Sequence, residues 1–98
     1  MRLYDTRTAT LSDLVPLVEG EVGIYVCGPT VQSSPHIGHL RSALVYDQWR
    51  RWLTHRGYRV TLVRNVTDID DKILASSSGT DEPWWALAYR YELEFTSV

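Results

Sequence analysis

Cysteine is nearly absent from the sequence, and neither sign of charge dominates. The single cysteine, Cys27, excludes an internal disulfide framework and is compatible with a reducing compartment. Twelve acidic and ten basic residues give a net charge of -2, so the overall composition carries no signature of nucleic-acid binding. A polynucleotide partner therefore has to be argued from motifs and not from charge.

Long hydrophobic runs are missing as well. The start of the chain, residues 1–5, contains no apolar signal core, and no run approaches membrane-spanning length. We expect no membrane partner and a cytoplasmic location. The chain also lacks internal repeats, and its only low-complexity patch, residues 76–80, is typical of a surface loop. Its 98 residues, 44% of them hydrophobic, can form one domain at most.

The middle of the chain has the pattern of a strand, a helix and a second strand. Residues 22–27 form a compact apolar run of the buried, central-strand type, and residues 37–56 place apolar and polar side chains on opposite helical faces. Gly57 is placed to end that helix, and residues 58–64 alternate as a strand does. A crossover of this kind makes the two strands parallel, so the sequence predicts an α/β fold with a parallel βαβ core.

Two further helices are expected towards the end of the chain. Residues 68–74 begin with acidic side chains, which are favourable at a helix start. Pro83 opens the last helix, in which four side chains recur at helical spacing as a stripe: Trp84, Ala88, Tyr91 and Phe95. Such a stripe usually packs in a core, and no following element is available to cover it. We therefore expect the chain to stop before its fold does.

Parallel strands bring their carboxyl ends to one edge of the sheet, where polar clusters meet. Residues 27–30 follow the first strand and residues 65–68 the second, so we expect them to lie together. The helix that carries His36 and His39 starts at the same edge. Both rings lie on one face of its first turn, beside unpaired backbone N–H groups and the positive end of the helix dipole, which favours a bound triphosphate. Gly38 leaves room for a nucleotide base or ribose against the backbone.

Each of these features has a plainer interpretation when taken alone. A lone cysteine at a strand end is most often a small buried hydrophobe, and a histidine pair at a helix start can simply form local hydrogen bonds. Residues 65–68 are also typical of a turn at a strand end, and the acidic run that follows is also typical of a helix cap. A solvated helix face is the plainer interpretation of the clustered arginines, which are Arg41, Arg50, Arg51, Arg56, Arg59 and Arg64.

Three ordered blocks give the chain a resemblance to bacterial cysteinyl-tRNA synthetases. They are residues 27–31 (CGPTV), 35–42 (PHIGHLRS) and 64–73 (RNVTDIDDKI), and the likeness extends from about Leu3 to the end. The resemblance implies that residues 1–98 are the amino-terminal part of a class I catalytic domain with an incomplete Rossmann-like fold. It also implies the activation of L-cysteine with ATP and magnesium to cysteinyl adenylate, followed by transfer to tRNA(Cys).

The resemblance implies which residues form the site. His36 and His39 correspond to the signature histidines that bind ATP and stabilise charge on the phosphates during attack by the carboxylate. Cys27 corresponds to the first ligand of a catalytic zinc, which binds the substrate thiolate and so rejects serine without an editing site. The other positions implied to hold cysteine, ATP or the adenylate are Gly28, Thr30, Gly38, Ser42, Asn65, Thr67 and Asp68.

The chain departs from the family's pattern in what it does not contain. A catalytic zinc needs about three protein ligands, and the family takes the others from much further along. No segment matches the lysine-rich second signature loop, and the helical anticodon-binding domain is absent. We therefore expect the 98 residues to be inactive on their own and to be the first part of a longer synthetase, either an expressed piece or a truncated gene product.

Three other interpretations stay open. A cysteine:glucosaminyl-inositol ligase of mycothiol synthesis shares the fold, zinc and adenylate chemistry, but the residues after Gly28 and after His39 favour the synthetase. A non-catalytic module would bind a nucleotide or a partner through its exposed aromatic stripe. A small complete nucleotidyl transferase that uses only the histidine motif would leave Cys27 and residues 65–73 unexplained.

Overall fold

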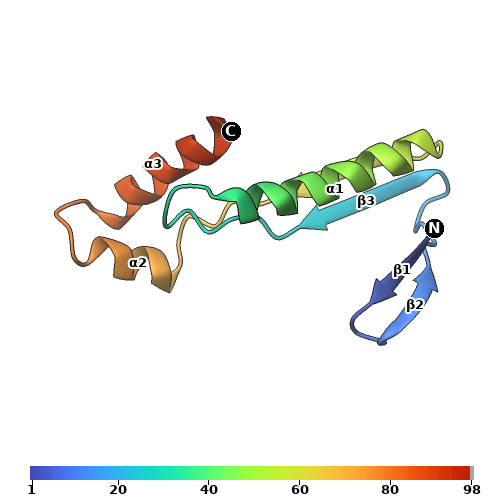
Figure 1. Cartoon of the computed structure of the whole chain (residues 1–98), viewed down its shortest axis with the longest axis horizontal. Coiled ribbons are helices and arrows are strands. Elements are labelled where there is room, and N and C mark those ends of the chain that lie inside the picture. The colour runs from blue at the N-terminus through green and yellow to red at the C-terminus, as the bar shows by residue number, and fades with distance from the viewer. Residues whose placement is uncertain (98) are drawn as a thin grey trace.

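The computed structural model describes residues 1–97, whose strands and helices follow one another along an elongated molecule of 51 × 29 × 24 Å (Figure 1). None of the helices in this part of the chain is both long and apolar enough to cross a membrane. In chain order the elements are β1 (Arg2–Asp5), β2 (Thr10–Asp13), β3 (Glu21–Val26), α1 (Ile37–His55), β4 (Arg59–Arg64), α2 (Asp71–Ser77) and α3 (Trp84–Ser97).

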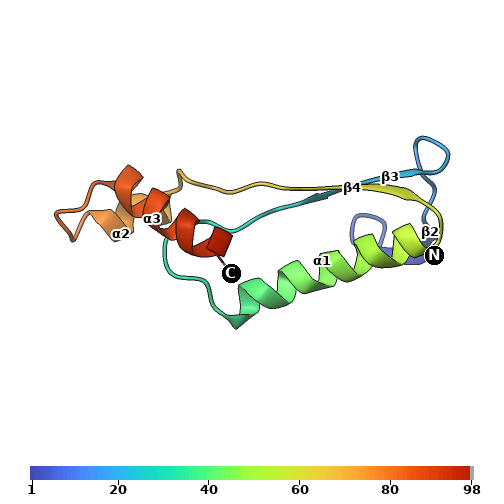
Figure 2. The same cartoon turned by 90° about the horizontal axis from the view of Figure 1, so that it is seen from above.

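The expected βαβ unit is confirmed. Strands β3 and β4 pair in parallel, from Glu21 opposite Arg59 to Val26 opposite Arg64, and α1 packs against β4 (Figure 2). Alternation along β3 buries Val22 and Val26, and the far end of α1 contributes the buried Leu53. Within residues 1–97 strand β3 pairs only with β4, so the expectation of a central strand is not met by the described sheet.

Helix α1 ends as the sequence predicts. Gly57 takes a positive φ of 91°, its N–H donates to the carbonyl oxygen of Thr54, and the N–H of Tyr58 donates to that of Leu53. These two bonds form a Schellman motif, which satisfies carbonyl groups that the helix end would otherwise leave unpaired. The chain therefore turns sharply into β4, which fixes where the second strand begins.

The acidic run supplies both the cap of α2 and a residue of its first turn, Asp70 and Asp71 respectively. Asp70 has extended backbone, and its side chain accepts a hydrogen bond of 2.9 Å from the N–H of Lys72. The helix consequently begins at Asp71, and the expectation that it starts near residue 68 is wrong. Residues 76 and 77 belong to the last turn of this helix, so only residues 78–80 of the expected surface loop lie outside regular structure.

The aromatic stripe of α3 is covered, contrary to the expectation from the sequence. Its member Ala88 belongs to a buried cluster with Val31, Ile73 and Leu87, and its three aromatic members are partly buried against that cluster. Val31 and Ile73 are fully buried. Helix α2 and the loop before α1 supply the cover, because α2 and α3 fold back on one another. The exposed stripe of α3 is a different one, made of Trp85, Tyr89 and Leu93.

The hairpin of β1 and β2 is not among the elements predicted from the sequence. Both strands are short, and all four residues of β2 are exposed. A strand that buries no side chain needs no alternation of apolar and polar residues, so the sequence gives little sign of it. Figures 1 and 2 show the hairpin beside the start of β3, whereas α2 and α3 lie beyond the carboxyl ends of β3 and β4. The two small units therefore sit at opposite ends of the parallel pair.

Gly28 is the glycine on which the strand ends depend. A Cβ added there would overlap the backbone carbonyl of Asn65, whereas one added at Gly23, within β3, would meet no atom within 4 Å. We predict that Gly28→Ala lowers the free energy of unfolding by more than about 2 kcal/mol, and that Gly23→Ala changes it by less than about 1 kcal/mol. Urea unfolding followed by tryptophan fluorescence measures both; equal effects would contradict the prediction.

Candidate functional site

The carboxyl ends of β3 and β4 are joined by hydrogen bonds that continue beyond the strands. The N–H of Thr67 donates to the carbonyl oxygen of Pro29 at 3.0 Å, and the N–H of Val31 donates to that of Thr67 at 3.1 Å. Thr30 and Thr67 form an isolated parallel bridge at this point. The expectation that residues 27–30 and 65–68 meet is therefore confirmed.

Asn65 clamps the two strand ends through its side chain. Its Oδ1 accepts a hydrogen bond of 2.7 Å from the N–H of Gly28, and its Nδ2 donates to Oγ1 of Thr67 at 3.3 Å. Both ends of the carboxamide are thus engaged within the protein. The close approach of Gly28 is possible only without a Cβ, so the glycine and the asparagine act as a pair.

The histidine pair caps the first turn of α1. Nδ1 of His36 accepts from the N–H of Gly38, and Nδ1 of His39 accepts from the N–H of His36, each at 3.1 Å. The two ring centroids are 3.9 Å apart. This reciprocal arrangement is a capping box in which histidine takes both roles that a hydroxyl and a carboxylate usually share. The local hydrogen bonds of the plainer interpretation therefore exist.

These bonds correct the expectation of unpaired backbone N–H groups at the helix start. The amides of His36 and Gly38 are used by the two imidazoles, and that of His39 donates to the carbonyl oxygen of His36 at 2.9 Å. Because each Nδ1 is an acceptor, each neutral ring carries its proton on Nε2. Neither Nε2 has a hydrogen-bond partner among residues 1–97, so the pair presents two N–H donors.

The structure explains the glycine at position 38 in a second way, besides the one expected from the sequence. A Cβ at this position would lie 2.9 Å from Cε1 and 3.0 Å from Nδ1 of His36. The glycine therefore leaves room for the His36 ring to fold back onto the helix start. Whether it also leaves room for a nucleotide stays a prediction.

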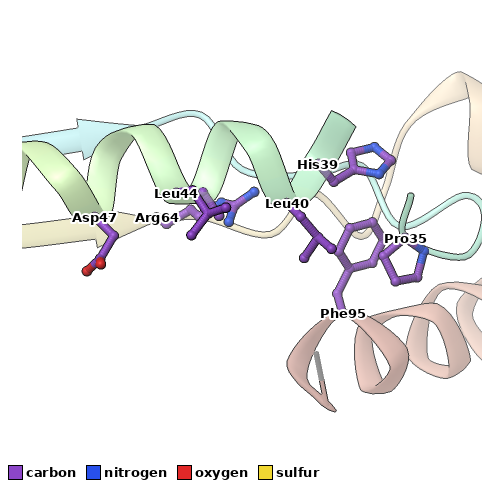
Figure 3. Close-up of a pocket in the computed structure, with 8 residues that line it drawn as sticks. Pro35, His39, Leu40, Leu44, Asp47, Arg64 and Phe95 are labelled. Carbon is purple, nitrogen blue, oxygen red and sulfur yellow. The ribbon is translucent and has the colours of Figure 1, made fainter. Parts of the chain in front are cut away.

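His39 lines a cavity of about 490 Å³ beside α1 (Figure 3). Burial, followed by the nearby charges of His36 and Arg64, lowers the pKa of His39 below its usual value of 6.5. The ring is therefore neutral at physiological pH, in the form that can donate from Nε2. The other residues that line the cavity are Pro35, Leu40, Ala43, Leu44, Asp47, Arg64 and Phe95.

Arg64 and Phe95 are neighbours of His39 that the sequence did not single out for the site. Arg64 belongs to the third sequence block and to the clustered arginines but was not among the expected site residues, although its place at the last position of β4 puts it at the same edge of the sheet. Phe95 was assigned to the stripe of α3, and its ring meets that of His39 edge-on, with centroids 5.1 Å apart. Only a three-dimensional structure could bring this residue of α3 to the start of α1.

Three of the clustered arginines form ion pairs, in keeping with a solvated surface. Arg50 and Arg51 both bind the carboxylate of Asp47, at 2.7 and 2.6 Å. Arg59 pairs with Glu21 across the parallel strands. The plainer interpretation thus holds for these three arginines, whereas Arg64 lines the cavity with His39.

Several predicted site residues are not brought to that cavity. Cys27 directly follows β3, and its thiol is exposed and not in a disulfide. Ser42 lines a separate cavity of about 310 Å³ on another side of α1, together with Gly38 and Arg41. Asp68 is exposed in the segment between β4 and α2. The described residues therefore form one bonded cluster at the strand ends and one at the helix start.

A complete metal site is not present within residues 1–97. No group of three or more histidine, cysteine, aspartate or glutamate side chains lies close enough together there to hold a metal ion. The described residues supply Cys27 as a single candidate zinc ligand, which does not amount to a site. Its ligand role stays a prediction.

Comparison with known proteins identifies similar sequences over the whole chain. A family model described as the class I (C) tRNA synthetase catalytic domain matches residues 13–98. The chain is 70% identical over 103 residues to a cysteine–tRNA ligase of Leifsonia xyli subsp. xyli, which covers 100% of this chain and 22% of that protein. This finding agrees with the resemblance carried by the three sequence blocks.

Two more relatives have the same name. The cysteine–tRNA ligase of Clavibacter michiganensis subsp. michiganensis is 70% identical over 101 residues, which are 98% of this chain and 21% of that protein. That of Renibacterium salmoninarum is 62% identical over 98 residues, which are 100% of this chain and 20% of that protein. The chain thus spans about a fifth of the length of the relatives it matches.

The lowered pKa of His39 makes stability depend on pH in a known direction. Between pH 6.5 and the lower native pKa, the unfolded chain binds a proton that the native ring does not, so stability falls as pH falls through this range. We predict that His39→Gln, which removes the titrating ring, flattens this part of the profile. Urea unfolding at a series of pH values measures it. An unchanged slope in the variant would contradict the assignment.

Proposed function

The chain belongs to the family of class I (C) tRNA synthetase catalytic domains, and we propose that the protein containing it charges tRNA(Cys) with L-cysteine. The observation that supports this most directly is the paired histidine cap of α1, which presents two imidazole N–H donors at the carboxyl edge of parallel strands. Ligands of open α/β sheets bind at that edge. The names of the relatives supply the amino acid and the tRNA.

The first step is formation of cysteinyl adenylate from L-cysteine and ATP, which enters with magnesium. An oxygen of the cysteine carboxylate attacks the α-phosphorus, and the bond from that phosphorus to the oxygen of pyrophosphate breaks. The Nε2–H groups of His36 and His39 donate to phosphate oxygens as negative charge develops on them. Their Nδ1 atoms stay bound to the helix start, so the donors are held in place before the substrate arrives.

The second step transfers cysteine to the tRNA. A hydroxyl of the terminal ribose at the 3′ end attacks the carbonyl carbon of the adenylate, and AMP leaves. Gly28, Thr30 and Thr67 hold the amino acid and its adenylate at the joined strand ends. Asn65 acts there by fixing the two ends to each other, because both polar atoms of its side chain are engaged. Ser42 and Asp68 complete the proposed ATP contacts from the helix and from the loop after β4.

Selection of cysteine is assigned to Cys27 as one ligand of a zinc ion, with the remaining ligands outside these residues. Its exposed position beside the strand ends leaves the thiol accessible to such partners. A zinc held by Cys27 and by ligands outside these residues would supply a position that a thiolate fills well and an alcohol poorly at neutral pH. Because tRNA charging serves translation, we place the reaction in the cytoplasm.

We predict that the full-length protein catalyses cysteine-dependent ATP–pyrophosphate exchange and that Gly38→Ala lowers its kcat about 100-fold by displacing the His36 ring. Stability should change little, since the lost cap costs about 1 kcal/mol and alanine regains about 1 kcal/mol of helix propensity. Isotope exchange and thermal unfolding measure the two quantities.

Gly79→Ala is the matched control, because a Cβ at that loop position meets no atom within 4 Å and the activity should not change. Transfer of cysteine to glucosaminyl-inositol instead of tRNA would replace the proposed function by the ligase of mycothiol synthesis. Binding of nucleotide without any exchange would favour a non-catalytic module.

The role of Cys27 is tested by Cys27→Ser in the full-length protein. We predict that bound zinc, measured by elemental mass spectrometry, falls below half of the wild-type content and that KM for cysteine rises more than about tenfold. Zinc content and KM equal to those of the wild type would leave Cys27 as an ordinary strand-end residue.

A further inference from the structure

We propose that Phe95 of α3 is a positioning residue for His39, holding its imidazole against the helix start and sheltering one side of it from water. This inference rests on the proposed function of the histidine pair in adenylate formation. It assigns a role in the reaction to a side chain of the last helix, far from the histidines in sequence. Nothing in the sequence blocks at residues 27–31, 35–42 and 64–73 includes Phe95.

The contact between the two rings is specific in geometry. Their centroids lie 5.1 Å apart at an interplanar angle of 75°, which is an edge-to-face arrangement. Figure 3 shows the Phe95 ring among Pro35, Leu40 and His39 at the end of the cavity. Nδ1 of His39 accepts a hydrogen bond from the N–H of His36, and the Phe95 ring is a second contact that restricts rotation of the imidazole.

Phe95 is itself held independently of α1. It packs on the buried cluster that contains Val31 and Ile73, and this cluster joins α3 to α2. The backbone of Val31 is bonded to that of Thr67 at the joined strand ends. The ring is therefore fixed by the same part of the fold that aligns the strands, and it supports His39 from outside the helix that carries it.

Shelter from water also explains the charge state of the histidine. Burial is the largest cause of the lowered pKa of His39, and His36 and Arg64 act in the same direction. Protonation would place a proton on Nδ1 and break the bond from the N–H of His36. Asp47, the other charged residue that lines the cavity, is paired with Arg50 and Arg51. Glu94, which precedes Phe95 in α3, is paired with Arg90 at 3.9 Å.

The test uses the full-length protein with Phe95→Leu, which keeps an apolar side chain but removes the ring. We expect the pKa of His39, followed by nuclear magnetic resonance with isotope-labelled histidine, to rise towards 6.5. We also expect kcat for ATP–pyrophosphate exchange to fall about two- to tenfold, the range that an edge-to-face pair supports, with the acid limb of its pH profile moved to higher pH. KM for cysteine should not change.

Two variants separate positioning from a general loss of structure. Phe95→Tyr keeps the edge-on ring and should retain the wild-type pKa of His39 and the wild-type pH profile. Leu93→Ala alters the exposed face of the same helix and should leave both unchanged. A His39 pKa and pH profile that do not move in Phe95→Leu would overturn the proposal, as would equal shifts in Leu93→Ala.

One measurement on the wild type decides the matter if Phe95→Leu does not fold. A nuclear Overhauser contact between the ring protons of Phe95 and His39 is expected, and its absence overturns the proposal. This contact and the pKa of His39 do not require activity. Loss of the proposed function would therefore appear as a wild-type protein without exchange, whereas failure of the positioning role would appear as an unchanged His39 pKa in a Phe95→Leu variant of a protein that does catalyse exchange.

Discussion

The hydrogen bonds between the carboxyl ends of β3 and β4 are the constraint on which the other features depend. Gly28 donates to the side chain of Asn65, and Thr67 bonds to the backbone on both sides of Thr30. These contacts extend the parallel pairing past the last strand residues and fix the positions of the two segments that follow the strands. The loop that leads into α1 and the segment that leads into α2 start from this point, so both helices take their positions from it.

Much of this arrangement could be predicted from local patterns in the sequence. The apolar run of β3, the amphipathic face of α1 and Gly57 each encode one element, and the crossover rule then makes the strands parallel. Their polar ends must meet once that pairing forms. The family and its catalytic domain were recognisable from three short blocks for the same reason, because those blocks are the strand ends and the helix start.

What the sequence did not predict depends on contacts between distant elements. The stripe of α3 was expected to lack a partner, because a helical pattern reveals an apolar face but not what covers it. The cover comes from Ile73 and Val31, one in a short helix and one in a loop, and neither has a periodic signal of its own. The same limitation hid Phe95 from His39. The hairpin of β1 and β2 could not be predicted from an apolar pattern, because its second strand is exposed throughout.

The double role of the histidine cap separates what the helix needs from what the proposed chemistry needs. Serine, threonine, aspartate or asparagine would cap the helix at His36, and glutamate or glutamine would serve at His39, the third helical position. Such side chains would keep the start of α1 paired, but the two Nε2–H donors would be lost. Helix capping and phosphate binding therefore place separate demands on these two positions.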